Sequence, residues 1–223
     1  MQKIRQKLAA VGAMLAATAM AFNASASADT TETQIQSDME THADGFAFFP
    51  IPDENINTTD LKFHNLHTEE RMTYAYSKGA GANDELNWFM RDFRRGEAAH
   101  LDTELLDLLT DIKTEINKRY PELDVQFQVI SAYRSLKTNN TLRNAGGGQA
   151  KISQHTHNTA MDIHIPGVSS EELRDIATCL GKGGVGYYQQ DDFVHVDTAR
   201  VRYWPSRAYL SGLSCNSAPG IST

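Results

Sequence analysis

The sequence predicts an α+β domain. Two stretches with helical apolar spacing occupy the middle of the chain, and short apolar runs separated by loops follow them, an order that differs from a βαβ repeat. The composition agrees, because 40% apolar and 22% charged residues are close to the average of a globular protein. A chain of 223 residues is long enough for one domain with its own hydrophobic core.

The elements follow from local patterns, in chain order. Leu61 to Leu66 and Met72 to Tyr76 alternate in polarity, which predicts two strands around a turn. Apolar residues at helical spacing predict a helix over 84–93 and a longer one that Asp102 caps. The later runs predict strands over 125–130, 160–165, 183–187 and 193–196, and helices over 138–143 and 171–180.

The N-terminus has the features of a secretory signal peptide over residues 1–26. Three cations precede an apolar run over 8–22, and small residues after it predict cleavage after Ala26 or Ala28. The run is too short to anchor the chain in a bilayer, so no membrane span is expected after its removal. The expected location is the periplasm or the exterior. We expect a poorly ordered lead-in over 27–58, the domain over 59–204 and a C-terminal tail over 205–223.

The charge balance bears on partners. The formal net charge is −7, and the pI calculated from the sequence is near 5.6. No basic field is therefore available to attract nucleic acid, which is not an expected partner. We expect a monomer.

Two cysteines remain, Cys179 and Cys215. Outside the cytosol an even pair is expected to form one disulfide, which would tie the tail to the helix around Cys179. The alternative is a buried thiol at Cys179 and an exposed one at Cys215.

The most informative stretch holds three imidazoles and one carboxylate within ten residues: His155, His157, Asp162 and His164. A catalytic zinc ion needs three side-chain ligands and one open position for water. His155 and Asp162 could provide two ligands, and His195 could provide the third from a neighbouring strand. The alternative is that these are surface and supporting histidines of a polar secreted protein.

Several motifs resemble a known superfamily. Ser131-Ala-Tyr-Arg134-Ser, Ser153-x-His155 with six residues to Asp162, and His195 are similar to the D-Ala-D-Ala carboxypeptidase and murein endopeptidase superfamily of zinc peptidases, the VanX and MepA type. The closest resemblance, to the MepK (YcbK-like) murein endopeptidases, is carried by residues 66–68, 91–94, 127–134, 137–139, 160–167, 183–188 and 193–198. It covers about Leu61 to Trp204 and implies a compact Hedgehog/DD-peptidase-like domain, with helices packed on a small, mainly antiparallel sheet.

The resemblance also implies roles for single residues. His155, Asp162 and His195 would bind one zinc ion, and Arg134 would hold the substrate or its developing oxyanion. The family pattern usually has glycine three residues after the first ligand, where this chain has Asn158. Asparagine tolerates left-handed backbone angles better than other non-glycine residues, so the loop can keep its shape.

Two aspartates compete for the role of general base, the group that takes a proton from the attacking water. Asp192 holds the place that the base has in several members of the superfamily, three residues before the last histidine. Asp197 is slightly favoured, because strand alternation puts it on the face of His195. The alternative for Asp197 is to orient a metal ligand, and the alternative for Asp192 is a solvated acidic turn.

Two further residues are expected at the cleft. His164 shares a strand face with Asp162 by the same alternation, so we expect it to support the site or to contact the substrate. Tyr187, with Tyr188, is expected in the cleft wall, although core packing explains one of the two equally well.

The resemblance thus implies an exported zinc metallopeptidase that hydrolyses peptide cross-links of peptidoglycan. The bond is D-Ala–meso-diaminopimelate or diaminopimelate–diaminopimelate, and the residues alone do not choose between them. The alternatives are a catalytically silent peptidoglycan-binding domain on the same fold, and a D,D-dipeptidase or carboxypeptidase. A serine hydrolase is disfavoured, because the sequence has no Gly-x-Ser-x-Gly motif.

Overall fold

The computed structural model describes residues 57–147, 149–205, 213 and 215. The predicted signal peptide, nearly all of the lead-in and most of the tail lie outside these residues. The described elements are β1 (Thr58–Asn65), β2 (Arg71–Ser77), α2 (Asp84–Phe89), α3 (Thr103–Arg119), β3 (Gln126–Ser131), α4 (Leu136–Asn144), the 3-10 helix η1 (Gln154–His157), β4 (Ala160–His164), α5 (Ser170–Leu180), β5 (Gly184–Tyr188), β6 (Phe193–Asp197) and β7 (Arg202–Trp204).

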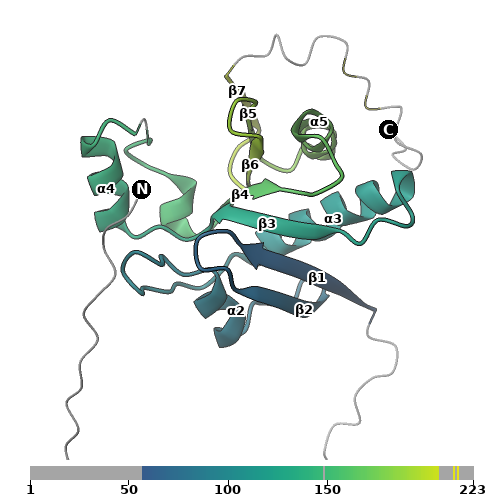
Figure 1. Cartoon of the computed structure of the whole chain (residues 1–223), viewed down its shortest axis with the longest axis horizontal. Coiled ribbons are helices and arrows are strands. Elements are labelled where there is room, and N and C mark those ends of the chain that lie inside the picture. Colours follow the sequence, from purple (N-terminus) through teal and green to yellow (C-terminus); the bar gives the residue numbers. More distant parts are fainter. Residues whose placement is uncertain (1–56, 148, 206–212, 214, 216–223) are drawn as a thin grey trace, which may run out of the picture. The chain divides into compact units, whose positions relative to one another are not determined.

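The described strands form one mixed sheet in the order β2-β1-β3-β4-β6-β5-β7. The pairs β1–β3 and β5–β7 are parallel, and the other neighbouring pairs are antiparallel. The predicted α+β class is confirmed, with four α-helices and seven strands in the described part of the chain. The sheet is larger than expected, because the N-terminal hairpin joins it through β1 and β3. Figure 1 shows its strong twist: β1, β2 and β3 cross the view, while β5, β6 and β7 are seen nearly edge-on.

The core lies between the sheet and the long helix α3. Asp102 caps this helix, since its carboxylate accepts a hydrogen bond from the Leu105 N–H at 3.0 Å. One face of α3 is fully buried, through Leu105, Leu109, Ile112 and Ile116. Each such side chain stabilises the fold by about 1.5–3 kcal/mol. Helix α3 also packs against α5, which in turn contacts β5 and β6.

Helix α2 ends at Phe89, although the apolar spacing predicted that it continues to Phe93. Beyond it, Asp92 forms a β-bridge with Glu97, and the Asp92 carboxylate accepts hydrogen bonds from the N–H and the hydroxyl of Ser135 at 3.1 and 2.7 Å. Ser135 is the N-cap of α4. The long-range hydrogen bonds of Asp92 thus compete with continuation of α2, and they fix where α4 begins.

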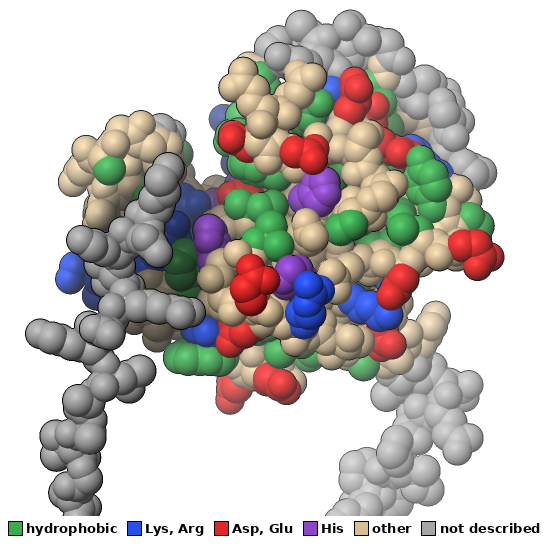
Figure 2. All heavy atoms as spheres, viewed as in Figure 1, with side chains coloured by type: hydrophobic (Ala, Val, Ile, Leu, Met, Phe, Trp, Pro, Cys, Tyr) green, Lys and Arg blue, Asp and Glu red, His purple; other side chains and the backbone are tan. Residues whose placement is uncertain are grey.

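Helix α4 stands to one side of the sheet in Figure 1. The space-filling view shows a hollow between this part and the strands, where basic and histidine side chains gather (Figure 2). On the opposite side of the domain, the structure joins Cys179 of α5 to Cys215 in a disulfide, with Cα atoms 5.2 Å apart. In the described part of the chain, no helix has the length and hydropathy to cross a bilayer.

Candidate metal centre

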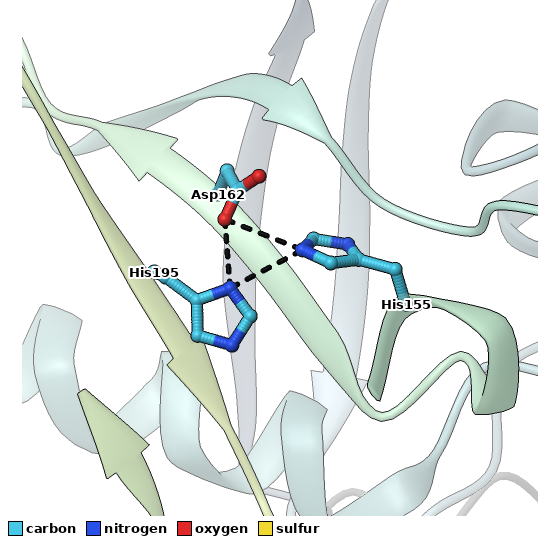
Figure 3. A group of neighbouring side chains, drawn as sticks. All are labelled: His155, Asp162 and His195. Atoms are coloured by element: carbon cyan, nitrogen blue, oxygen red, sulfur yellow. Dashed lines mark hydrogen bonds and ion pairs between the residues drawn. The ribbon is translucent and has the colours of Figure 1, made fainter. Parts of the chain in front are cut away.

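Three buried side chains from different elements point at one another: His155 from η1, Asp162 from β4 and His195 from β6 (Figure 3). Asp162 Oδ1 lies 2.8 Å from His195 Nδ1 and 3.3 Å from His155 Nε2, and the two nitrogens are 3.2 Å apart. A tetrahedral metal ion with bonds of about 2.0–2.1 Å holds its ligand atoms about 3.3 Å apart. The donor set and its spacing therefore fit such an ion.

Strand register brings two of these residues together. Asp162 on β4 and His195 on β6 are directly paired across the antiparallel ladder. His155 arrives from η1, which ends at Asn158 in the left-handed conformation, with φ 57° and ψ 32°. Asparagine thus takes the backbone conformation for which the family pattern has glycine. The Asn158 side chain also donates to the Ala99 carbonyl oxygen at 2.9 Å, which ties this loop to the segment before α3.

Each imidazole is oriented by a second hydrogen bond. His155 Nδ1–H donates to the Ala132 carbonyl oxygen at 2.8 Å, which leaves Nε2 free to bind a metal. His195 Nε2–H donates to Asp197 Oδ2 at 2.9 Å, so Nδ1 is the nitrogen that faces Asp162 and His155. Metal-binding histidines commonly use their second nitrogen in this way, since it fixes the tautomer and the ring direction.

The charges of the site are strongly coupled. Burial opposes ionisation of Asp162, but the neighbouring imidazoles, His155 first, outweigh it and hold the pKa of this carboxyl below its usual range. Burial also opposes protonation of His195, while Asp162 and Asp197 raise its pKa above the ordinary value. This cluster attracts positive charge, which a metal cation can supply in place of a proton.

Asp197 lies behind His195, and both of its oxygens are occupied. Oδ1 accepts from the N–H groups of Gly184 and Ala199 and from Arg202, and Oδ2 accepts from His195 and Arg202. The side chain is fully buried, and its hydrogen bond to His195 is on the nitrogen that faces away from Asp162. The sequence-based preference for Asp197 as general base disagrees with this geometry, because no oxygen is free to accept a proton at the metal position.

Asp192 lies in the turn between β5 and β6 and is largely exposed. Its backbone is left-handed, with φ 53°. His164 Nδ1 donates to the Asp192 carbonyl oxygen at 2.9 Å and lies 3.4 Å from its carboxylate. Neither His164 nor Asp192 is among the described residues that line the cleft over the three ligands.

That cleft has a volume of about 490 Å³. His155, Asp162 and His195 lie in its lining, and Arg134 lines it as well. The backbone N–H of Arg134 donates to the His155 carbonyl oxygen at 3.0 Å, and its guanidinium donates to Ser131 Oγ at 3.0 Å. Arg134 is thus fixed beside the first ligand.

Comparison with known proteins places the chain in a family. A family model described as peptidoglycan L,D-endopeptidase MepK matches residues 53–204. The peptidoglycan L,D-endopeptidase MepK of Escherichia coli strain K12 is 40% identical over 168 residues, which are 72% of this chain and 90% of that protein. This chain belongs to the MepK family. The probable peptidoglycan L,D-endopeptidase MepK of Haemophilus influenzae is 36% identical over 148 residues, 65% of this chain and 77% of that protein. No solved structure gives a significant match.

In this MepK-family chain the aromatic wall of the cleft is built from Tyr188, Phe193 and Trp204. The rings of Tyr188 and Phe193 are stacked with centroids 4.4 Å apart, and Trp204 Nε1–H donates to the Tyr188 hydroxyl at 3.0 Å. Tyr187 points the other way: it is buried, and Arg174 of α5 lies over its ring. Of the two tyrosines expected at the cleft, Tyr188 lines it, whereas Tyr187 is not among the described residues of its lining, as alternation along β5 requires.

Trp204 and Arg202 were missed as site residues of this MepK-family chain. Both lie on β7, whose three residues are too few to show a periodic pattern. The available signal was upstream, in Gly184 and Gly186, which pair with Arg202 and Trp204 across β5 and β7. A side chain at either glycine would overlap the facing Arg202 or Trp204 side chain. Glycines at alternate positions of a strand therefore indicate that side chains from another segment pack closely on that face of the strand.

Proposed function

We propose that this chain is a zinc-dependent endopeptidase that hydrolyses L,D-cross-links of peptidoglycan, of which the diaminopimelate–diaminopimelate bond is the candidate. One observation carries the proposal: three buried ligand atoms converge at the lining of a cleft, and each imidazole directs one nitrogen there while its other nitrogen is held by a supporting hydrogen bond. Membership of the MepK family supports peptidoglycan as the substrate.

His155, Asp162 and His195 are the proposed ligands. Two imidazoles and one carboxylate form a ligand set of hydrolytic zinc enzymes, in which a fourth position stays open. Zinc bound there would act as a Lewis acid that polarises the scissile carbonyl and lowers the pKa of water to about 7. The two rings need little rearrangement to receive the ion, because Ala132 and Asp197 already hold them.

Arg134 is proposed to bind the substrate beside the metal. Its guanidinium lines the cleft, and the side chains to which it donates hydrogen bonds in the described part of the chain, Ser131 and Asn139, are neutral. A guanidinium with neutral partners keeps its charge available for the carbonyl oxygen that gains negative charge during attack, or for a substrate carboxylate. Tyr188, Phe193 and Trp204 would pack against the apolar parts of the peptide.

Asp197 is proposed to position His195. Asp192 does not line the cleft in this structure, and it is proposed to act as the general base by reaching in from the turn before β6. Asp192 is exposed, lies three residues before His195 and adopts a left-handed conformation, a kind of strain that is enriched at functional sites. His164 is proposed to support the Asp192 turn through its hydrogen bond to the backbone there, in place of a direct substrate contact.

The remaining parts of the proposal concern the whole chain. Residues 1–26 would direct export and be removed, and 59–204 would form the peptidase domain. The mature protein would work as a monomer in the periplasm or outside the cell. The three cations before the apolar run and the small residues after it support export.

The test combines metal binding with product analysis. Purified protein should bind one zinc ion, and cross-linked muropeptides of defined linkage should yield hydrolysis products by mass. A chelator should stop the reaction, and zinc should restore it. His155→Ala should lose both zinc and turnover. Binding of peptidoglycan without hydrolysis by zinc-loaded protein would instead establish a silent binding domain, and release of a terminal D-alanine would establish a carboxypeptidase.

A further inference from the structure

Arg94 follows α2 and is exposed, yet aromatic contacts hold its side chain. The guanidinium lies over the Phe93 ring, 4.3 Å from its centroid. Phe93 in turn is stacked on His67, with centroids 4.5 Å apart and planes 24° apart. The backbone at His67 is fixed by a hydrogen bond from its N–H to Asn65 Oδ1 at 2.9 Å. Such a stack reduces the conformational freedom that a free arginine side chain would lose on binding a ligand.

This stack adjoins the metal cleft through Arg134. His67, Phe93, Arg94 and Arg134 line one small hollow, and Arg134 also lines the cleft over the metal ligands. Burial is the largest influence on the pKa of the Arg134 guanidinium and lowers it; the Asp162 carboxylate opposes this, and the positive charge of Arg94 adds to it. The two cations are therefore electrostatic neighbours at one end of the cleft.

The neighbouring Arg91 and Arg95 differ from Arg94 because each forms an ion pair with a glutamate. Arg91 forms an ion pair with Glu70 at 3.0 Å, and Arg95 forms one with Glu97 at 2.5 Å. Within the described part of the chain, no ion pair is formed by Arg94 or by Arg134. Two neighbouring guanidinium groups, one of them half-buried, repel each other in the free protein. An anion bound between them would relieve that repulsion.

We propose that Arg94 and Arg134 together bind a carboxylate of the cross-linked peptide, at a position separate from the scissile amide. This inference rests on the proposed function, because it assigns part of the same substrate. A planar carboxylate accepts two parallel hydrogen bonds from a guanidinium, so this pair suits a carboxylate better than a neutral carboxamide. Arg94 is then a specificity residue, and it leaves the metal ligands untouched.

The experiment compares two substrates and two variants. The substrates are a cross-linked muropeptide with free carboxylates and the same peptide with these groups converted to carboxamides. The variants are Arg94→Gln and the neighbouring control Arg95→Gln, which removes an exposed arginine already paired with Glu97. For Arg94→Gln we expect kcat/KM to fall about 10-fold on the free carboxylates, mainly through KM, and less than about 2-fold on the carboxamides. Arg95→Gln should match the wild type on both substrates.

A second readout needs no metal. The wild type treated with chelator should bind the hydrolysed carboxylate peptide more tightly than its carboxamide, and Arg94→Gln should lose that preference at unchanged thermal stability. Equal losses on both substrates, or no loss, would overturn the inference even though the wild type hydrolyses the peptide. A wild type that hydrolyses neither peptide would contradict the proposed function instead, and the binding preference would still decide the role of Arg94.

Discussion

At the scale of single residues, the hydrogen bonds of Asp197 separate two roles that a carboxylate can have beside a metal. Asp197→Asn keeps the shape but removes the charge that holds His195 Nε2–H and Arg202. We expect the affinity for zinc to fall about 10- to 100-fold, since supporting groups of metal ligands have effects of this size. Turnover should recover at saturating zinc. Competition with a chelating dye measures the affinity, and steady-state rates at rising zinc measure the recovery.

Asp192→Asn is the matched variant. It should keep the zinc affinity and lose turnover by about 10² to 10⁴, the usual contribution of a general base. The opposite result would restore Asp197 as the base. In that case Asp192→Asn would retain both zinc affinity and activity, and Asp197→Asn would lose turnover even at full zinc occupancy.

A second residue-scale prediction concerns Asp92, which is buried where α4 begins. Burial raises the pKa of this carboxyl, but the Thr138 and Ser135 hydroxyls and the Ser135 N–H lower it more, so the net pKa lies below its ordinary value. Asp92→Asn should therefore lower the free energy of unfolding by about 1–3 kcal/mol at pH 7. A carboxyl whose pKa is lower in the folded protein than in the unfolded chain stabilises the fold at pH values above its unfolded pKa of about 3.9. This stabilisation is lost as the pH falls through the pKa of the folded state.

Urea unfolding of the wild type and of Asp92→Asn at pH 7 and at pH values below about 4 checks this sign. The difference between the two proteins should shrink as the medium becomes acidic. Asp60→Asn, at an exposed position of β1, is the control and should match the wild type at both pH values. A difference for Asp92→Asn that is the same at every pH would show that its charge contributes nothing.

At the scale of elements, the glycines of β5 decide how β7 reaches the site. Gly186 lies under the Trp204 ring, whose centroid is 5.0 Å from that of His195. In Gly186→Ala the new methyl group would overlap Trp204 and push it toward the cleft. We expect a loss of stability of about 1–3 kcal/mol from overpacking, with a lower kcat/KM and a changed tryptophan fluorescence spectrum.

The control for this prediction is Gly81→Ala, where an added methyl would meet His100 only at an ordinary contact distance of 3.8 Å. If Trp204 is the obstacle, Gly186→Ala should cost much less in a Trp204→Leu background, because two residues in contact are not additive. An equal cost in both backgrounds would place the strain elsewhere.

Elements with a sustained pattern were predictable from the sequence, and those that depend on distant partners were not. The apolar stripe of α3 and its Asp102 cap define that helix locally, and the observed helix begins at Thr103. Helix α2 was predicted too long because the partner of Asp92, Ser135, lies 43 residues away. The three residues of β7 and the four of η1 are too short for any period to appear.

The candidate site shows the same division. Histidines and aspartates in one stretch indicated metal chemistry, but the pairing of Asp162 with His195 depends on the register between β4 and β6. Local patterns do not determine that register, so the chemistry made these three residues candidates only, and the resemblance to zinc peptidases favoured them over the alternative of surface histidines. The role of Asp197 could not be predicted without knowledge of its hydrogen-bond partners. Strand alternation alone cannot distinguish a general base that faces the cleft from a carboxylate that lies behind a metal ligand.

At the scale of the whole molecule, the Cys179–Cys215 disulfide closes a loop that contains β5, β6 and β7. This segment supplies His195 and the aromatic wall of the cleft, whereas Asp162 and His155 lie before it in the chain. The bridge is formed between α5 and the tail, so it restrains the unfolded segment without contacting a ligand. Its contribution should therefore appear in stability and leave the chemistry unchanged.

The last prediction is the effect of removing this bridge. With a sequence separation of 36 between the cysteines, the chain-entropy model assigns it about 3–4 kcal/mol. The double variant Cys179→Ser, Cys215→Ser should lose about that much in guanidinium unfolding, and it should keep the wild-type zinc affinity and kcat/KM at 25 °C. A reductant should destabilise the wild type and leave the double variant unchanged. Intact mass after alkylation of exported protein checks the premise: two alkylated thiols without prior reduction would show that the native protein has no bridge.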